Sequence, residues 1–447
     1  MMMMNNNLLP AKKNIVALDI NRNKQAKKTF KLRHIFNLNR RCKGVRSVNV
    51  TSDNRYLIIT FERTNPSIRV VDLEKLEFLP HKYTGHTDSV RLTSITRDNK
   101  AFYTASWDGS SRRFEIASGN CTQILSGFGR SPSCFLDSEQ KYLFTASYDS
   151  DFDLKSNNAG RCWDLSSGNT IKIYKHTHKR SNPESMDIAY DEGRVYTGSD
   201  DGYAYQWNVR GRKPLLKYFA FKGSVRKVAI SSNYFAAACT DGLVRVHNKL
   251  SGKRFRYFFH GKTDVRDARI SKDETKLWSV AENGSISCFN LMTGELKYHR
   301  KLHSDWIWST CLMSEEKILV TGSSDGSITF LSADSGQIIA QLLNFPWNND
   351  FLIKCPPDKV FPTGFFYTTN KDFIQVVMGN KKRRIHEKLD LDDPRREAYI
   401  NKLNLKNLII TRLKSNGHYT SLTEKYIRNQ KILNQACDQK SPRLLSA

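Results

Sequence analysis

The chain of 447 residues carries 71 Lys and Arg against 44 Asp and Glu, which gives a formal net charge of +27. It has no apolar run of about 18 residues, so we expect no transmembrane helix, and its start has no apolar core of the kind that secretory signals carry. Aromatic residues make up 11% of the sequence, which argues against a mostly disordered protein. The length allows one large all-β domain or several smaller domains.

The excess of positive charge has two interpretations. It favours polyanionic partners, such as nucleic acid or an acidic protein surface, because opposite charges attract each other over long distances. Alternatively, much of the Lys is only solvated surface in a chain that is rich in both Lys and Asn. The distribution of the charged residues over the fold therefore decides between a polyanion-binding surface and solvated surface charge.

The nine cysteines are spread along the chain, at positions 42, 121, 134, 162, 239, 288, 311, 355 and 437. No two of them have the C-x-x-C spacing and no Cys/His group has zinc-finger spacing, so we expect no metal site and no cofactor. An odd number of cysteines without a secretory signal favours a reducing compartment. We therefore expect an intracellular, cytoplasmic protein, while KKRR at 381–384 leaves nuclear import open.

Two strand-like stretches come first in the chain, NIVALDI at 14–20 and TFKLRHIF at 29–36, after a segment at 1–13 that we expect to be disordered. A repeated hairpin signature follows, with copies such as SWDGSSRRFEIASGN, CTDGLVRVHNKLSGK, AENGSISCFNLMTGE and SSDGSITFLSADSGQ. Each copy has an Asp-Gly or Asn-Gly turn, which suits a tight hairpin because positive φ is accessible there. The alternating run after the turn is typical of a half-buried strand.

The spacing of the copies indicates the architecture. A large residue six positions after the turn Asp or Asn recurs at positions 114, 207, 247, 289 and 331, and two looser units place Val71 and Trp163 at the same point of the repeat. The intervals are about 42 residues, as in propeller repeats, apart from one that a polar insertion at 150–158 lengthens. Seven units with four strand-sized stretches each predict the blades of an all-β propeller.

These units resemble the WD-repeat (tryptophan–aspartate) β-propeller family, most clearly in TGHTDSV…DGSSRRFEIASG, GRCWDLSSG and LHSDWIW…SSDGSITFLSADSG. The resemblance covers roughly residues 40 to 345, although each single copy is degenerate. It implies a buried hydrogen-bond network of His, Ser or Thr, Asp and Trp in each blade, with a structural and not a catalytic role. The residues that match these positions are His86, Ser106, Asp108, Trp163, Ser199, Asp201, Trp207, Asp241, His303, Ser323 and Asp325, with His178 as a doubtful addition.

The number of blades is open to two interpretations. The seventh unit already has its own outer strand, and three more strand-like stretches follow it, FLIKC, GFFYTTN and FIQVVMGN. Since a ring should not leave sheet edges open, we favour eight blades over residues 14–380, with the N-terminal strand completing the blade that begins at 351. Seven blades with these strands packed outside the ring are the alternative.

The pattern changes after residue 380. A basic linker leads into two expected helices over 381–447, the first capped by Asp393 with Pro394 next to it, the second starting at the capping box of Ser421. This helical tail either packs on the propeller or binds a partner or a second copy of the chain.

One register gathers positive charge at a repeated position. Several units begin their innermost strand with Val-Arg, and the seventh unit has Ile307-Trp308 there. By the resemblance, this level lies near the narrow entrance of the central channel, a frequent docking face. The predicted partner-binding residues are Arg46, Arg91, Arg226, Arg266, Trp107, Trp306 and Trp308. Alternatively, the Arg side chains fill space between blades and pair with neighbouring acids such as Asp267.

The sequence has no phosphate-binding Gly loop, nucleophile elbow or H-E-x-x-H motif, so we expect a protein without catalytic activity. The favoured function is a scaffold that docks other proteins, with acidic surfaces, on the Arg- and Trp-bearing rim. The alternative is a propeller that binds RNA or ribonucleoprotein through its basic surface. No membrane association is expected, and the sequence does not predict an oligomeric state.

Overall fold

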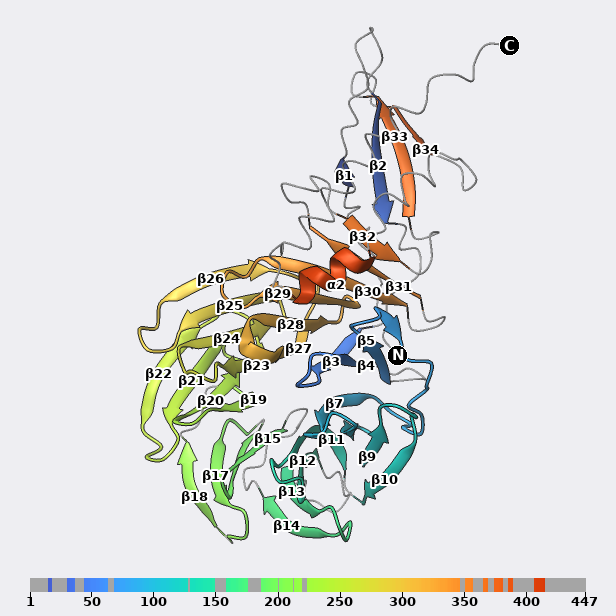
Figure 1. Cartoon of the computed structure of the whole chain (residues 1–447). Coiled ribbons are helices and arrows are strands. Elements are labelled where there is room, and N and C mark those ends of the chain that lie inside the picture. Colours follow the sequence, from blue (N-terminus) through green and yellow to red (C-terminus); the bar gives the residue numbers. More distant parts are fainter. Residues whose placement is uncertain are drawn as a thin grey trace, which may run out of the picture.

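The computed structural model describes residues 15–17, 30–36, 44–62, 68–127, 129–148, 158–175, 186–199, 201–211, 213–218, 223–345, 350–356, 365–368, 374–380, 385–388 and 406–414. Within this part of the chain, seven antiparallel blades form a closed ring (Figure 1). We number them blade 1 to blade 7 in chain order; each is one contiguous stretch of chain whose first strand is innermost and whose later strands lie successively further out.

In each blade the strands follow one another in chain order from the centre of the ring outward. The innermost strands are β3 (Val45–Val50), β7 (Val90–Ile95), β11 (Arg130–Leu136), β15 (Met186–Asp191), β19 (Val225–Ile230), β23 (Val265–Ile270) and β27 (Ile307–Leu312). The second strands are β4 (Tyr56–Phe61), β8 (Ala101–Ser106), β12 (Tyr142–Tyr148), β16 (Arg194–Ser199), β20 (Tyr234–Cys239), β24 (Lys276–Ala281) and, after the short 3₁₀ turn η1 (Ser314–Glu316), β28 (Ile318–Ser323).

The outer half of each blade contains the hairpin that the sequence signature predicts. The third strands are β5 (Ile68–Asp72), β9 (Ser110–Glu115), β13 (Asn158–Asp164), β17 (Ala204–Asn208), β21 (Leu243–Asn248), β25 (Ser285–Asn290) and β29 (Ser327–Ser332). The fourth strands, which are outermost in blades 1 to 6, are β6 (Glu77–Phe78), β10 (Cys121–Ser126), β14 (Thr170–Lys175), β18 (Pro214–Tyr218), β22 (Arg254–Phe259), β26 (Leu296–Lys301) and, in blade 7, β30 (Ile338–Phe345).

The hydrophobic core lies between neighbouring blades. Each strand alternates its side chains between the two faces of its sheet, and one face packs on the preceding blade while the other packs on the next blade. Tyr218 of blade 4, for example, stacks on Phe235 of blade 5 with ring centroids 4.4 Å apart. Gly198 and Gly322 occupy equivalent points where blades meet closely, and a Cβ on Gly322 would lie 2.7 Å from Cγ1 of Val45.

The prediction of eight blades was wrong. The ring closes by direct packing of β27 against β3, where the backbone N–H of Val48 donates to Oγ of Ser309 at 2.9 Å. Because the seven inner strands already form a closed ring, the strands after β30 have no place among them. The strands β31 (Asp350–Cys355) and β32 (Phe365–Thr368) instead extend blade 7 outward along the open edge of β30.

The N-terminal strand does pair with the last strands of the chain, but outside the ring. β2 (Phe30–Phe36) lies between β1 (Ile15–Ala17) and β33 (Ile374–Asn380), and β34 (Ile385–Lys388) completes this separate sheet. No strand of this sheet pairs with a described strand of the seven blades. Terminal closure of a ring blade, as we expected it, is therefore replaced by a sheet beside the ring (Figure 1).

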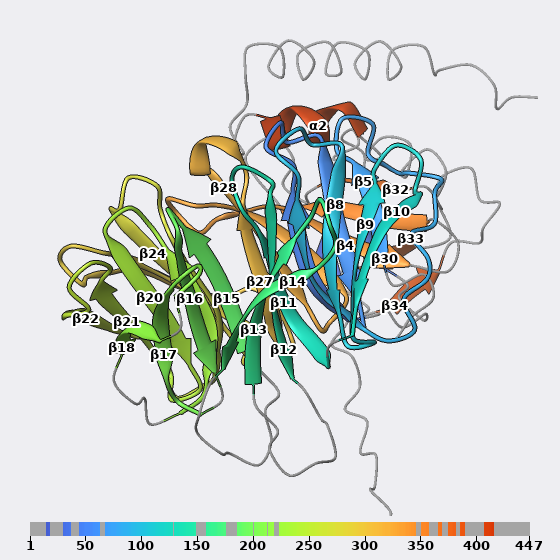
Figure 2. The same ribbon diagram turned by 90° about the horizontal axis from the view of Figure 1, so that it is seen from below.

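One helix past residue 380 is described, α2 (Lys406–Lys414), and it lies on one face of the ring (Figures 1 and 2). Ile409 and Leu413 are buried in the core cluster that blades 1 and 7 share. The helix starts expected at Pro394 and Ser421 lie outside the described residues, so the helical tail as we expected it is not supported. In the described part of the chain, no helix has the length and apolar character needed to cross a membrane.

Candidate partner-docking rim

The Val-Arg positions predicted from the repeat all lie at the start of innermost strands, in a β-bulge. In blade 1, Val45 pairs with Phe61 and Ser47 with Thr60, so Arg46 has no partner in the register. The same register shift occurs at four equivalent residues, Arg91, Arg226, Arg266 and Trp308. Since a bulge redirects the side chain of its extra residue, these five side chains leave the alternation of their strands at one level of the ring.

The residue across each bulge follows the second strand of the same blade. Its backbone N–H closes the bulge by donating to the carbonyl two residues before the bulged position. These bonds are Glu62 N to Gly44 O at 3.2 Å, Trp107 N to Ser89 O at 3.0 Å, Thr240 N to Ser224 O at 3.1 Å, Glu282 N to Asp264 O at 3.0 Å and Ser324 N to Trp306 O at 2.9 Å. Repetition of this bond gives the five bulges the same local geometry.

The bulged side chain and the side chain across the bulge contact each other in blades 1, 2, 6 and 7. The carboxylate of Glu62 forms an ion pair with Arg46, and that of Glu282 forms an ion pair with Arg266. In blade 2, the guanidinium of Arg91 lies 4.3 Å from the ring centroid of Trp107. In blade 7, Nε1 of Trp308 donates to Oγ of Ser324.

Trp308 lies at the centre of the group. The guanidinium carbons of Arg46, Arg266 and Arg91 lie 3.8, 4.7 and 5.1 Å from its ring centroid. These arginines come from blades 1, 6 and 2, so one indole connects side chains from both sides of the ring closure. Trp306 packs on Trp308 with centroids 5.1 Å apart and is 39% exposed. We call Arg46, Arg91, Arg226, Arg266, Trp107, Trp306 and Trp308 the Arg/Trp rim.

The rim continues into blade 5 through a shared carboxylate. Asp264 lies 3.8 Å from Arg226 and 3.9 Å from Arg266. At the other end, Arg130 of blade 3 lies 5.4 Å from the ring centroid of Trp107. Our sequence reasoning missed Arg130, because the strand register places Pro132 and not Arg130 at the level of Arg91.

The alternative expectation, that the rim arginines pair with acids, is supported for some of them, although with other acids than the one suggested. Asp267 lies 3.6 Å from Arg269 and accepts from the N–H of Thr310 at 2.8 Å. The acids that lie beside the rim arginines are Glu62, Asp264 and Glu282, and not Asp267. Much of the rim's positive charge is therefore neutralised within the protein, and its most exposed large apolar group is Trp306.

The family's buried network is present in blades 2 and 7. In blade 2, His86 contacts Asp108 through Nδ1 at 2.6 Å and Thr104 through Nε2 at 2.7 Å. Ser106 contributes differently, because its Oγ accepts from the N–H of Asp108 at 3.2 Å. Burial raises the pKa of the Asp108 carboxyl, but the hydrogen bond and the charge of His86 and the Ser110 hydroxyl lower it more, so the pKa lies well below its ordinary value.

Blade 7 repeats this arrangement. His303 contacts Thr321 at 2.8 Å and Ser327 at 2.9 Å, and its Nδ1 lies 3.4 Å from Asp325. The N–H of Asp325 donates to Oγ of Ser323 at 3.1 Å. These contacts join the turn before the innermost strand to the second and third strands, which is a blade-stabilising role.

The other predicted network residues lie in reduced forms of the same arrangement. Trp163 and Trp207 each donate through Nε1 to a threonine of the second strand, Thr145 and Thr197, at 2.9 Å. Asp201 accepts the N–H of Tyr203 at 2.9 Å, and Asp241 pairs with Arg245 instead of a histidine. Ser199 is buried at the end of β16, while His178 lies outside the described residues.

One network histidine escaped our sequence reasoning. His260 contacts Ser279 at 2.7 Å and Ser285 at 2.8 Å, and only 5% of it is exposed. Burial, with a smaller effect of the charge of His299, lowers the pKa of His260 to about 4. The signal was HGKTDV, which matches GHTDSV in blade 2 with one residue more before the valine. Across the described residues, no three His, Cys, Asp or Glu side chains are grouped closely enough to hold a metal ion.

Comparisons with known proteins agree with the fold. A family profile described as "WD domain, G-beta repeat" matches residues 294–330. In three dimensions the chain is similar to the WD40 β-propeller domain of Doa1, with a TM-score of 0.54, 17% identity and coverage of 66% of this chain and 94% of that domain. At this identity the likeness shows the fold alone.

Curated relatives are distant and match in part. The human F-box/WD repeat-containing protein 10 is 22% identical over 221 residues, 42% of this chain and 20% of its own length. Autophagy-related protein 16 of Arabidopsis thaliana is 23% identical, covering 58% and 42% of the two chains. The serine-threonine kinase receptor-associated protein of Gallus gallus is 21% identical, covering 53% and 64%. The chain thus spans only a fifth to about two thirds of the length of these relatives.

Proposed function

Since the chain is a WD-repeat β-propeller, we propose that it is a non-catalytic scaffold that docks a protein partner on the Arg/Trp rim. Proteins of this fold typically act as interaction scaffolds, presenting several loops on a rigid ring. One of the distant relatives is itself named for its association with a kinase receptor.

The observation that carries the proposal is the exposure of Trp306. A monomeric fold has no need to leave 39% of a tryptophan in water beside a second tryptophan, and such residues dominate the binding energy of protein interfaces. Trp308 holds Trp306 in place, because the ring of Trp308 is itself fixed by Ser324 and by three guanidinium groups. The indole pair is therefore a preorganised anchor that loses little side-chain entropy when a partner binds.

The paired arginines give this surface a second property. The guanidinium groups of Arg46 and Arg266 are held by Glu62 and Glu282 and are only 8% and 11% exposed, so only the small exposed part of each can donate to a hydrogen-bond acceptor of the partner. The partner that fits is a protein segment with an apolar side chain next to hydrogen-bond acceptors. Strong attraction of a highly acidic surface is not required, because part of the rim's charge is balanced internally.

The test is capture of a purified partner by the full-length chain. The partner is first identified by affinity purification after nuclease treatment, and its binding is then measured for the Trp306→Ala variant. We expect a loss of at least about 2 kcal/mol, as for an interface hot spot. The matched control is Ile124→Ala, which removes an apolar side chain of 53% exposure from β10, away from the rim.

Unchanged binding by Trp306→Ala, with both variants folded, would exclude the Arg/Trp rim as the docking site. Substituting the four arginines is a poorer test, because a glutamate in place of Arg46 or Arg266 would lie against Glu62 or Glu282 and destabilise the fold.

A further inference from the structure

Seven cations without carboxylate partners are gathered on the flank of blades 5 and 6. The outermost strands of these blades, with the loops at their ends, carry the cations Lys253, Arg254, Arg256, Lys262, Lys297, Arg300 and Lys301. None of the seven forms an ion pair with a residue of the described chain. The stretch 253–262 contains no Asp or Glu, and 295–301 contains only Glu295. We call this surface the blade 5–6 flank.

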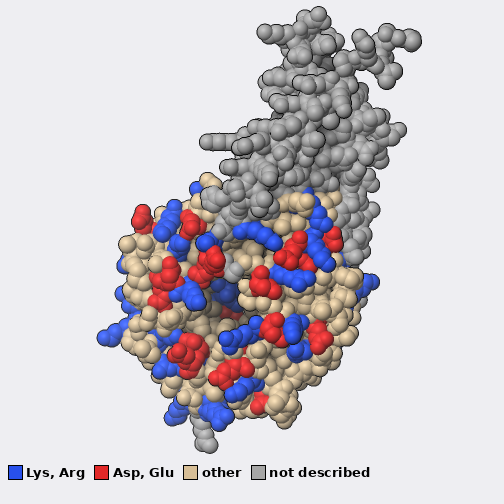
Figure 3. Space-filling model, in the orientation of Figure 1, with Lys and Arg blue, Asp and Glu red and all other residues tan. Residues whose placement is uncertain are grey.

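The ring face that carries α2 shows the opposite distribution. On that face Lys and Arg alternate with Asp and Glu around a central hollow (Figure 3). Many of these charges are paired there, as Lys249 with Asp191, Lys276 with Asp334 and Lys414 with Glu74. On the blade 5–6 flank none of the seven cations has such a carboxylate partner among the described residues, which leaves positive potential on this surface.

Exposed aromatic rings lie among these cations. Phe255, Tyr257 and Phe259 on β22 are 36%, 46% and 58% exposed. An outermost strand has one open edge, and three large rings on it leave more apolar area in water than a solvated surface needs. The ring of Tyr257 is already covered in part by the guanidinium of Arg254, at 4.9 Å from the ring centroid. A planar group thus stacks on this ring in the protein itself.

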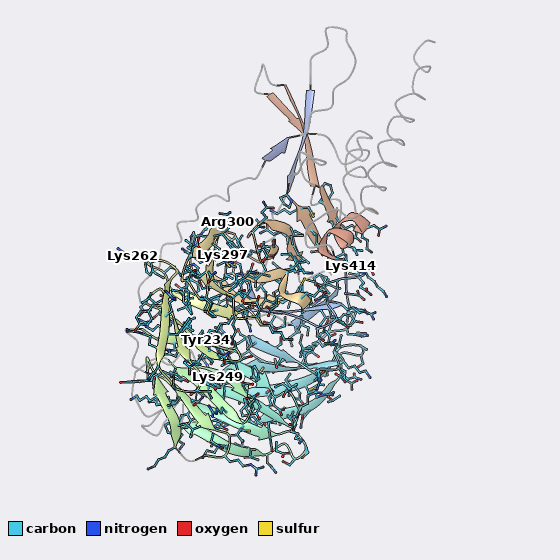
Figure 4. All side chains as sticks on the ribbon, turned by 60° about the vertical axis from the view of Figure 1, so that its left-hand side comes forward. Tyr234, Lys249, Lys262, Lys297, Arg300 and Lys414 are labelled. Atoms are coloured by element: carbon cyan, nitrogen blue, oxygen red, sulfur yellow. The ribbon has the colours of Figure 1, made fainter. Side chains whose placement is uncertain are left out.

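The two blades form one continuous surface. Nη2 of Arg256 on β22 donates to the carbonyl of Met292 in blade 6 at 2.8 Å. The rings of His260 and His299 meet across the same boundary with centroids 5.5 Å apart. Figure 4 shows Lys262, Lys297 and Arg300 on the same side of the ring. By the alternation of β22, Tyr257 and Phe259 lie on the face turned away from blade 6, while Arg256 lies on the face that meets it. One extended ligand can contact these rings and the cations of blade 6 if it crosses the exposed outer edge of β22.

We propose that the blade 5–6 flank binds single-stranded nucleic acid. The unpaired cations would contact the phosphates, and exposed bases would stack on Phe255, Tyr257 and Phe259, as in known single-strand sites. An acidic peptide would use the cations but has no planar groups for the rings. A duplex hides its bases within the stack, so it would also leave the rings unused. This site is separate from the Arg/Trp rim and does not depend on the protein partner proposed above.

The experiment measures fluorescence anisotropy of a labelled single-stranded RNA of about 12 nucleotides, a length typical of one such site, with the full-length chain. The same titration uses a DNA strand of equal sequence, the duplex form, polyglutamate and vesicles of anionic lipid. We expect tight binding of the single strands, weaker binding of the duplex, and a log–log salt dependence whose slope is about −0.7 for each phosphate neutralised. Binding of duplex, polyglutamate or vesicles as tight as that of the single strand would overturn the proposal.

Two variants assign the binding to the flank. The ring variant, Tyr257→Ala with Phe259→Ala, keeps all charge, and we expect it to weaken binding by at least about fivefold per lost stack without changing the salt slope. The charge variant changes Lys253, Arg254, Lys297 and Arg300 to Gln, and we expect it to reduce the slope by about two to three. If the ring variant fails to fold, the charge variant still tests whether the flank is the binding site.

The matched control removes the same charge from blades 1 and 2, by changing the exposed residues Lys75, Lys82, Arg97 and Lys100 to Gln. If this control weakens RNA binding as much as the charge variant does, binding follows net charge and the site is wrong. Trp306→Ala should leave RNA binding unchanged, so that failure of the rim and failure of the flank are told apart.

Discussion

The guanidinium of Arg46 in blade 1 lies 3.8 Å from the ring centroid of Trp308 in blade 7. These two residues come from opposite ends of the propeller sequence, and they meet where the ring closes. In this ring no strand is exchanged between the first and last blades, so the seam depends on packing, on the Val48–Ser309 hydrogen bond, on this cation–π contact and on α2.

The contact across the seam should be measurable as a coupling energy. In a double-mutant cycle of Arg46→Met and Trp308→Leu, we expect a coupling of about 0.5 to 2 kcal/mol in urea unfolding, because the pair is partly desolvated. The control cycle combines Arg113→Met with Trp308→Leu; Arg113 lies on β9 and contacts Thr122 instead of the rim. A coupling no larger than that of the control would mean that the two seam residues only lie near each other.

The helix α2 should stabilise the seam through its apolar face and not through its ion pairs. Ile409→Ala should lower the free energy of unfolding by about 2 to 4 kcal/mol, because this side chain is fully buried in the cluster shared by blades 1 and 7. Lys414→Gln should cost less than about 1 kcal/mol, since its pair with Glu74 is 64% and 52% exposed. Equal costs for the two variants, measured by urea unfolding, would disagree with this assignment.

Removal of residues 1–37 should leave the unfolding of the ring nearly unchanged. An N-terminal strand that completed a ring blade would make this deletion sharply destabilising, but β2 pairs only with β1 and β33. Differential scanning calorimetry of the deleted and full chains gives the answer. A fall of the main transition by many degrees would show that the first strands support the ring after all.

Stability should decrease as the pH falls from about 6.5 toward 4, because of buried histidines. His260 has a folded pKa of about 4 against an unfolded value of about 6.5, so the unfolded chain binds the extra proton in this window. The neutral ring's contribution is complete above pH 6.5, and about 2 kcal/mol of it is lost by pH 5. Burial, followed by the charges of Arg245 and Arg254, likewise lowers the pKa of His247 to about 4.

The variant that checks this is His260→Gln, studied by urea unfolding between pH 7 and 5. It should be less stable at pH 7 and show a flatter pH dependence than the native chain. The carboxyl groups of Asp108 and Asp325 act in a separate range, because their lowered pKa makes their contribution disappear only at more acidic pH. A native slope retained in His260→Gln would assign the effect to other groups.

A single buried carboxylate should hold three blades together. Asp187 of blade 4 is 2% exposed; it accepts from Lys227 at 3.1 Å and from the N–H of Val228 at 2.8 Å in blade 5, and from Ser133 in blade 3. Asp187→Ala should cost about 3 kcal/mol, because it leaves a half-buried ammonium and a buried N–H without their partner. The control Asp334→Ala, which removes a pair with an exposed carboxylate, should cost under about 1 kcal/mol.

The repeat could be predicted from the sequence because a hairpin turn and a strand alternation are local. The Val-Arg register was predicted for the same reason, since the pair starts the innermost strand in four of the seven blades. The acids that neutralise Arg46 and Arg266 were not predicted, because Glu62 and Glu282 contact them through a bulge, and a bulge leaves no mark in an alternating pattern.

The blade number could not be predicted because it is a property of the whole ring. Strands β31 and β33 look like the strands of an eighth unit, and only the packing of β27 on β3 decides that no further inner strand fits. His260 shows the reverse case. Its motif was visible in the sequence, but one additional residue before Val265 hid the match.

The contiguous build of the blades has a consequence for synthesis of the chain. The apolar face of β3, with Val45 and Val48 almost fully buried in the finished ring, has no neighbour on its seam side until blade 7 exists. At ordinary translation speed the delay between blades 1 and 7 is on the order of tens of seconds. For all that time the growing protein is an open arc with an uncovered apolar end. A premature stop within blade 7 would therefore yield a product prone to self-association, and shielding of that nascent end by a chaperone would matter more than for a protein whose first strand is covered early.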